Sequence, residues 1–306
     1  MKKISFASRL IPVLLLALIG CATSESSLSR EIDNRNRSIL HSFLAEQTLT
    51  DRPPTGEIVF FDFDHTLADT RTRIPVDTPS GQELRDSKCF HVEPGERPHY
   101  DALGAEELKA TRPVQELLTI ARQKQARGAL IFVITARGED HTWQTIPAWM
   151  KNHGIPIDGV VAVNSVRTRR ELLDRLNLPD GAERLPGDFK KALIISGWIS
   201  LMQQKGPVQS VSYYEDTDHH LRGAMQLLPA QYPGLNLQIF DIVRTVGGQD
   251  HSPDAPAVDE SSEVSYSLRL IAEQKMSPMH DQSNAKLRFE FPGDPRNYSS
   301  KDCPFD

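Results

Sequence analysis

The stretch IVFFDFDHTLADT (residues 58–70) joins a short apolar run to a pair of acids. Residues 58–61 are β-branched or aromatic without polar alternation, which is typical of a strand in a parallel sheet covered on both faces. Asp62 and Asp64 follow the run directly. In open α/β sheets the ligand site lies outside the carboxyl ends of the strands, so both acids are candidates for a functional site.

Strands and helices are predicted to alternate in most of the chain. Apolar runs indicate further strands at 129–138, 159–166, 207–216 and 235–243. Helical periodicity indicates helices at 31–48, from 113 to about 128, and at 188–204. This alternation favours βαβ units and a Rossmann-like α/β fold with an open parallel sheet.

Two segments show no clear period. Residues 70–110 are rich in Pro, Gly and charge, and we interpret them as a small insertion or lid after the first strand of a domain at 56–248. Residues 249–306 form a polar tail with only short apolar stretches. The tail either pairs as an edge hairpin or binds a partner.

The N-terminus has the features of an export signal. Basic residues precede a short apolar core within residues 1–20, and a small residue precedes Cys21. This pattern resembles a bacterial lipoprotein signal, which implies cleavage before Cys21, a lipid on that cysteine and a Ser-rich tether and helix at 21–55. The resemblance implies an exported, membrane-anchored protein, in the outer membrane or periplasm of a Gram-negative host. An ordinary secretory signal with a chance cysteine is the alternative.

Composition excludes several broad classes. The chain has 306 residues, of which 39% are hydrophobic and 25% charged, and these are ordinary globular values. The net charge of −6 and the dispersed Lys and Arg residues argue against a dedicated nucleic-acid binder. Apart from Cys21 the cysteines are Cys89 and Cys303, which either pair or remain free thiols.

Several polar side chains are predicted to meet at the carboxyl edge of the sheet. Asp62 and Asp64 end the first strand, Thr135 ends the second, and Glu215 and Asp216 end the fourth. Carboxylates gathered in this way require a compensating charge. Mg²⁺ prefers oxygen ligands and is commonly held by one or two carboxylates together with a substrate phosphate. We therefore expect a Mg²⁺ site that draws in a phosphate ester.

The same residues resemble the motifs of the haloacid dehalogenase (HAD) superfamily over about residues 57–245. The resemblance rests on Asp62-x-Asp64-x-Thr66, on Thr135, on a lysine at a helix start and on the acids that end a later strand. It implies that Asp62 is the nucleophile and Asp64 the acid and base. It also implies Asp62, Asp64 and Asp216 as the metal ligands. The expected activity is Mg²⁺-dependent hydrolysis of a phosphate ester through an aspartyl phosphate.

The family also implies a cation that offsets the phosphoryl charge. Residues 187–194 offer Lys190 and Lys191, and we prefer Lys190 as the phosphate-binding lysine beside Thr135. Residues 214–220 resemble the motif Tyr-Glu-Asp-Arg-x-x-His of the Swiss Army Knife RNA-repair-like branch. Thr217 replaces the Arg of that branch, so nucleic acid is not the expected substrate, although RNA or DNA ends stay open.

Other polar residues are expected to have lesser roles. Glu215 is expected to support the site or to be exposed, and Asp218 is a second candidate for a metal contact. His65 is expected to pack and to form hydrogen bonds, and His91 and His99 in the insertion are candidates for contact with substrate. His219 and His220 are candidates for metal binding, although adjacent side chains of a helix point in different directions. The alternative function is a surface lipoprotein that keeps the fold as a binding or structural module without turnover.

Overall fold

The structure is a computed structural model, and it describes residues 34–70, 73–86, 94–99, 108, 111–138, 141–177, 187–246, 249–250, 264–275 and 288–289. The predictions for Cys21, Cys89, Cys303 and His91 lie outside the described residues, as do those for the signal segment at 1–20 and most of the tail.

The main sheet has eight strands and is mostly parallel. Its strands are β1 (Gly56–Phe61), β7 (Leu130–Thr135), β8 (Gly159–Ala162), β9 (Val208–Glu215), β10 (Asn236–Val246), β11 (Gln249–Asp250), β12 (Val264–Gln274) and β13 (Arg288–Phe289). The strand order is β13-β12-β10-β9-β1-β7-β8, with β11 paired to β10. The strands from β10 to β8 run parallel, whereas β11, β12 and β13 are antiparallel. The predicted α/β class with a parallel sheet is therefore confirmed.

The order of the strands places a reversal next to β1. The chain moves from β1 outward through β7 to β8, and then crosses β1 to form β9 and β10 on its other side. The connections that follow β1 and β9 therefore leave the sheet in opposite directions. Open α/β sheets bind their ligands at the carboxyl ends of the strands that flank such a reversal.

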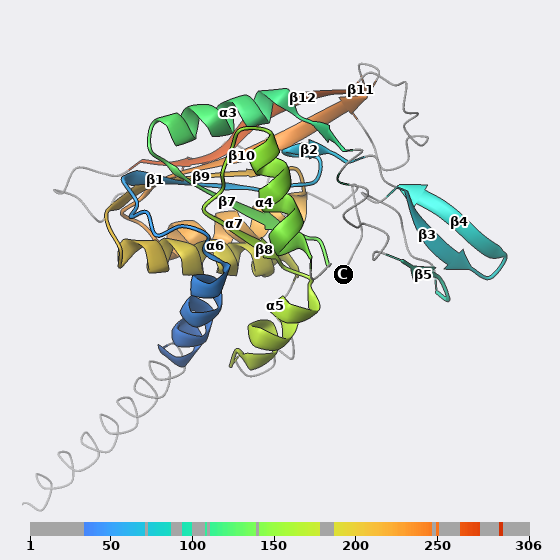
Figure 1. The fold of residues 1–306 in the computed structure, drawn as a ribbon, viewed down its shortest axis with the longest axis horizontal. Coiled ribbons are helices and arrows are strands. Elements are labelled where there is room, and N and C mark those ends of the chain that lie inside the picture. Colours follow the sequence, from blue (N-terminus) through green and yellow to red (C-terminus); the bar gives the residue numbers. More distant parts are fainter. Residues whose placement is uncertain are drawn as a thin grey trace, which may run out of the picture.

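Helices cover both faces of the sheet, as Figure 1 shows for α3 and α6. The described helices are residues 34–47, α3 (Gln115–Ala126), α4 (Thr142–Asn152), α5 (Val166–Glu171), the short 3-10 helix η2 (Leu173–Arg175), α6 (Gly187–Gln203) and α7 (Asp218–Gln231). Alternate residues of β1 serve the two cores: Phe60 stacks on Phe132, at 5.5 Å between ring centroids, and Phe61 stacks on Tyr214 at 4.6 Å. The first core includes side chains of helix 34–47, α6 and α7, and the second includes those of α3 and α4. Burial on both faces explains the continuous apolar run of this strand.

The insertion contains strands that the sequence pattern did not reveal. Its base is closed by β2 (Ala68–Asp69) against β6 (Arg112–Pro113), and β3 (Arg73–Thr78), β4 (Gly81–Asp86) and β5 (Arg97–Pro98) form a separate antiparallel sheet. In Figure 1 this sheet projects from the body of the domain. Charged residues and proline interrupt the alternation of β3 and β4, which hid them from a periodicity analysis.

The segment that the sequence set apart as a tail contributes to the main sheet. β12 pairs with β10 in a register that runs from Leu237 opposite Gln274 to Val246 opposite Val264. Ile271 and Ala272 of β12 are buried in the core that α6 covers. The edge pairing that we considered for this region is present, and it extends the sheet by an eleven-residue strand.

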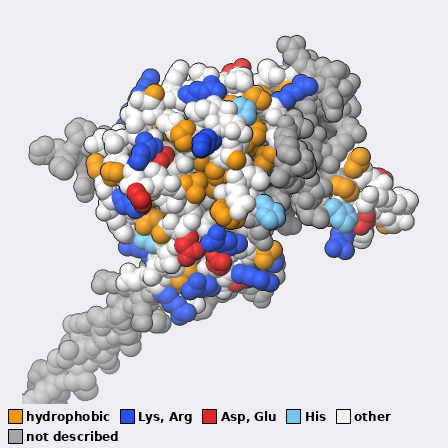
Figure 2. Space-filling view, in the orientation of Figure 1, with side chains coloured by type: hydrophobic (Ala, Val, Ile, Leu, Met, Phe, Trp, Pro, Cys, Tyr) orange, Lys and Arg blue, Asp and Glu red, His pale blue; other side chains and the backbone are white. Residues whose placement is uncertain are grey.

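The face of the molecule drawn in Figure 2 carries side chains of several kinds. On the face drawn in Figure 2, Lys and Arg side chains are interspersed with apolar and acidic ones. None of the described helices combines the length with the apolar character that crossing a membrane requires.

Candidate functional site

The site begins one residue beyond β1. The backbone N–H of Asp62 donates to the carbonyl of Tyr214 at 2.9 Å, which continues the pairing of β1 with β9 past the end of the strand. Asp62 is 4% exposed. Its carboxylate is therefore fixed at the edge of the sheet where the strand order reverses.

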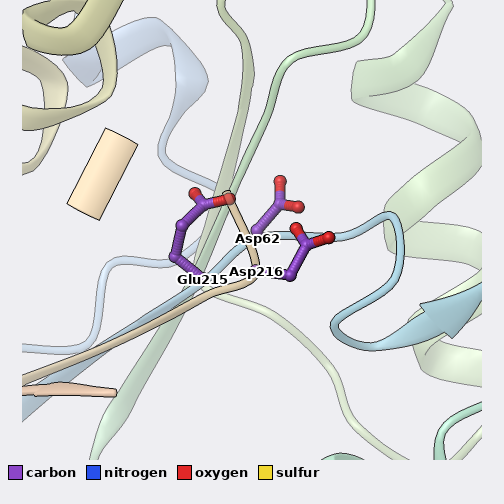
Figure 3. Close-up of side chains that lie close together, drawn as sticks. All are labelled: Asp62, Glu215 and Asp216. Atoms are coloured by element: carbon purple, nitrogen blue, oxygen red, sulfur yellow. The ribbon is translucent and has the colours of Figure 1, made fainter. Parts of the chain in front are cut away.

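Three carboxylates gather at this edge. One oxygen from each of Asp62, Glu215 and Asp216 lies within 4.8 Å of the others, and Figure 3 shows the three side chains close together. Asp62 follows β1, whereas Glu215 ends β9 and Asp216 follows it. The predicted convergence of the acids of two strands is confirmed. Glu215 is fully buried, so the expectation of an exposed position for it was wrong.

Lys191 joins two of these acids. Its Nζ donates to Oδ1 of Asp62 and to Oε2 of Glu215, both at 2.7 Å, and its side chain is 1% exposed. Lys190 is directed elsewhere, with its Nζ 3.4 Å from Oδ1 of Asn164. Adjacent side chains of a helix point in different directions, so only one of the two lysines reaches the acids. The lysine at Asp62 is therefore Lys191, and our preference for Lys190 in that position is corrected.

Burial and the neighbouring charges shift the pKa values of Asp62, Glu215 and Lys191. Burial, reinforced by Glu215, raises the pKa of Asp62 well above its usual range. Burial also raises the pKa of Glu215, against the opposing effect of Lys191. The carboxylates outweigh the penalty of burying the ammonium of Lys191, so its pKa is raised as well. Lys191 contacts two of the three acids that gather here, Asp62 and Glu215.

Glu215 is also held by its neighbours in sequence. The hydroxyl of Tyr213 donates to Oε2 of Glu215 at 2.5 Å, and the backbone N–H of Thr217 donates to Oε1 at 3.2 Å. The negative surroundings and burial raise the pKa of Tyr213, which therefore remains a donor. Glu215 thus has a fixed orientation between β9 and the start of α7.

Asp64 lies in a second, separate arrangement. Arg137 binds it through both oxygens, from Nη2 to Oδ1 at 2.8 Å and from Nε to Oδ2 at 2.9 Å. The hydroxyls of Thr70 and Thr135 add donors at 2.7 and 3.3 Å. Burial opposes ionisation, but Arg137 and the hydroxyls prevail and lower the pKa of Asp64.

The expected metal ligands are revised on this basis. Asp64 was predicted to bind metal with Asp62 and Asp216, yet its oxygens are engaged by Arg137 and the threonines. Among the described residues, Glu215 takes its place in the acidic group. Three oxygen donors so close together suit Mg²⁺, which prefers carboxylate and water ligands.

Sequence reasoning missed Arg137, whose side chain is 2% exposed and whose guanidinium lies 5.4 Å from the centroid of the Phe63 ring. Its backbone N–H donates to Oγ1 of Thr135 at 3.2 Å. A signal was present, because Arg137 follows a strand-ending threonine by two residues and therefore leaves the same edge of the sheet.

The turn after β1 is tightly built. His65 is buried and has a φ of 58°, the left-handed conformation that non-glycine residues seldom adopt. Its N–H donates to the carbonyl of Ala68 at 2.7 Å, and the N–H groups of Leu67 and Ala68 donate to Phe63. These bonds return the chain into β2 immediately after Asp64.

The remaining histidines and Asp218 lie outside the acidic group. His99 pairs with Asp77 at 2.7 Å within the small sheet of the insertion. His219 and His220 follow Asp218, which begins α7, and burial lowers the pKa of His220 well below its usual range. Their ring centroids are 4.0 Å apart. None of these four residues belongs to the described group that could hold a metal.

Comparison with known proteins gives no family. No model of a known protein family matches the chain, and no match was found among curated proteins. A function must therefore be inferred from the site itself.

Proposed function

We propose that the protein is a Mg²⁺-dependent phosphohydrolase with a HAD-type core that acts through an aspartyl phosphate. The observation that carries this proposal is the environment of Asp62, which is buried, contacts Lys191, lies beside two further acids and is followed two residues later by Asp64. A buried ion pair is not needed to hold a strand end. Such an arrangement suits a nucleophile that must meet a negatively charged phosphoryl group.

In this proposal Asp62 attacks phosphorus, and the bond to the leaving oxygen breaks as Asp64 protonates it. Water then attacks the aspartyl phosphate, with Asp64 accepting its proton, so that inorganic phosphate leaves and Asp62 is regenerated. Asp62, Glu215 and Asp216 would hold the metal, which neutralises the carboxylates and polarises phosphoryl oxygens when bound.

The other polar groups have supporting roles. Lys191 offsets the charge between Asp62 and Glu215, and the hydroxyl of Thr135 is available to the phosphoryl group when it turns from Asp64. Arg137 keeps Asp64 ionised, the state that activation of water requires. Asp64 must therefore separate from Arg137 before it can carry a proton to the leaving group.

The proposed setting is that of an exported lipoprotein anchored through Cys21, with Lys2 and Lys3 in its leader. The substrate is a phosphate ester that reaches this compartment. The alternative of a binding module without turnover is weakened by the two acids at residues 62 and 64, because ligand binding alone does not require both.

Hydrolysis of an aryl phosphate, with Mg²⁺ or with a chelator, tests the proposal. The wild-type protein is expected to turn over only with Mg²⁺, and Asp62→Asn is expected to lose at least about a thousandfold in rate while keeping its fold. Asp77→Asn, which alters an acid of the insertion sheet, is the matched control and should retain activity.

The outcomes separate the two functions. Turnover retained by Asp62→Asn would remove the nucleophile assignment. A folded wild-type protein whose melting temperature rises with Mg²⁺, but which hydrolyses no phosphate ester in a broad panel, would favour the binding module.

A further inference from the structure

A further buried cation, Arg244, lies beyond the acidic group. Arg244 is in β10, three residues past the position where β10 pairs with the end of β9. Across the sheet it faces Tyr266 of β12. Its side chain is 2% exposed, although arginine is almost never buried without partners.

The contacts of Arg244 do not satisfy its guanidinium. Nη2 lies 3.5 Å from Oδ1 of Asp69, but that oxygen already accepts a hydrogen bond from the hydroxyl of Tyr266 at 2.8 Å. In the part of the chain that the structure describes, Nε, Nη1 and Nη2 are all buried without a hydrogen bond. Arginine stays charged at any ordinary pH, so these donors cannot be removed by losing a proton. Leaving them unmet is costly, which indicates that another group accepts their hydrogen bonds.

Two other buried cations among the described residues are paired. Lys191 donates to two carboxylates, and Arg137 binds Asp64 through two nitrogens. Arg269 on β12, whose side chain is 46% exposed, also has a partner, since its Nε donates to Asp241 at 3.0 Å. Arg244 therefore differs from its counterparts in having a single, distant carboxylate that is shared with Tyr266.

Arg244 is close to the candidate active site. β10 and β1 flank β9, so two interstrand spacings, about 10 Å, separate them. Asp69 ends β2, five residues after Asp64, and Asp216 is near enough to Tyr266 to contribute to its raised pKa, after the larger effects of burial and Asp69. The distance between Asp62 and Arg244 is therefore one that a molecule larger than a phosphate group can span.

We propose that Arg244, positioned by Asp69 and Tyr266, binds an oxyanion carried by the substrate at a distance from the phosphoryl group that is cleaved. This inference rests on the proposed phosphohydrolase function and narrows its substrates to phosphate esters with a second phosphate or carboxylate group. A guanidinium offers parallel N–H donors that match the oxygens of either group. The nitrogens of Arg244 that have no hydrogen bond provide those donors.

Anion binding without metal is the first test, because it requires no turnover. The melting temperature of the purified full chain is measured against inorganic phosphate in the presence of a chelator. The wild-type protein is expected to show a saturable rise, and Arg244→Met is expected to show none. Arg269→Met is the matched control and should keep the rise.

The stability of the variant itself distinguishes a ligand role from a structural one. Replacing a buried guanidinium whose nitrogens lack hydrogen bonds with an apolar side chain of similar length is expected to leave the melting temperature unchanged or raise it. A saturable rise of equal size in Arg244→Met, or no saturable rise in the wild-type protein, would overturn the anion site.

The second test compares an aryl phosphate with the same compound carrying an added carboxylate, in the presence of Mg²⁺. In the wild-type protein the ratio of their kcat/KM values should favour the second compound, and Arg244→Met should lower this ratio at least tenfold. An unchanged ratio would show that the site takes a free anion and would overturn the substrate assignment. If neither compound is hydrolysed but the phosphate effect depends on Arg244, the phosphohydrolase proposal fails while the anion site stands.

Discussion

At the scale of single residues, the pairing of Lys191 with two buried acids is the most sensitive contact in the site. Replacing Lys191 by Met leaves Asp62 and Glu215 without their shared cation, and we expect a loss of about 3 kcal/mol in the free energy of unfolding. Lys190→Met should change it by less than about 0.5 kcal/mol, since the hydrogen bond of Lys190 within the described residues is a long one, to Asn164 at 3.4 Å. Urea unfolding of both variants measures the difference, and equal losses would contradict the assignment of Lys191.

Arg137 provides a prediction that depends on pH. Arg137 is buried, whereas the side chain of its partner Asp64 is 25% exposed. The contribution of this ion pair to the free energy of unfolding should therefore lie between those of surface and buried pairs. We expect Arg137→Met to lower the free energy of unfolding by about 2 kcal/mol at pH 7. Because the pKa of Asp64 is lower in the folded than in the unfolded protein, this stabilisation is fully present above the unfolded value of about 3.9. It is lost as the pH falls through the folded value.

Stability curves of wild-type protein and Arg137→Met between pH 7 and pH 3 test this. The two curves should begin to converge below about pH 4, the unfolded value, and should meet only below the lower pKa of folded Asp64. Arg269→Met, which removes a more exposed contact to Asp241, is the control and should cost at most about 1 kcal/mol. A constant difference across the range would mean that Arg137 stabilises the fold by packing alone.

The sequence predicted the part of the site whose residues come directly after strands. Asp62 and Asp216 follow strands directly, so the topology alone brings them together. The choice between Lys190 and Lys191 depends on the rotation of α6 relative to the sheet, which the apolar pattern of this helix does not define because it is buried on most sides. The partner of Asp64 depends on a side-chain orientation after β7, which no spacing rule determines.

At the scale of elements, the contact between α6 and helix 34–47 depends on a glycine. A Cβ at Gly197 would lie 2.6 Å from side-chain atoms of Leu40 and Leu44. Alanine is the better helix former by about 1 kcal/mol, yet the overlap should dominate, and we expect Gly197→Ala to destabilise the protein by about 1–3 kcal/mol. Thermal unfolding provides the measurement.

A double variant checks the cause of that loss. Leu40→Ala removes one of the two side chains that the new methyl group would meet, so Gly197→Ala should cost less in that background than in the wild-type protein. Equal losses of stability in both backgrounds would show that the two helices accommodate the added methyl group at Leu40 without a cost in free energy.

The elements themselves were predictable to different degrees. The core strands were evident because burial on both faces produces continuous apolar runs, as in β7 and β8. The strands of the insertion were not, since β4 reads GQELRD and its described residues lie at the surface. Its pairing with β3 depends on partners that a local pattern cannot reveal.

At the scale of the whole molecule, the C-terminal region is a structural part of the domain. β12 covers the edge of β10 along almost its full length and buries Ile271 and Ala272. A chain that ends at residue 246 would expose this edge and lose the partner of Arg244, and we expect it to aggregate or to melt at least about 10 °C lower.

A chain that ends at residue 275 keeps β12 and is the matched control. It should remain soluble and melt close to the full chain, because β13 adds only two paired residues. Light scattering and thermal unfolding of the two truncated chains measure the difference. Similar behaviour of both would mean that β12 contributes little to stability.

The central position of β1 has a consequence for how the protein is made. β1 leaves the ribosome early, but its neighbour β9 lies at 208–215, so the middle of the sheet is closed by contacts between distant parts of the chain. Asp62 therefore exists for much of synthesis without Lys191, Glu215 or Asp216. Folding and assembly of the charged site become one event, and a nascent chain that stops before residue 191 carries Asp62 without the lysine that neutralises it.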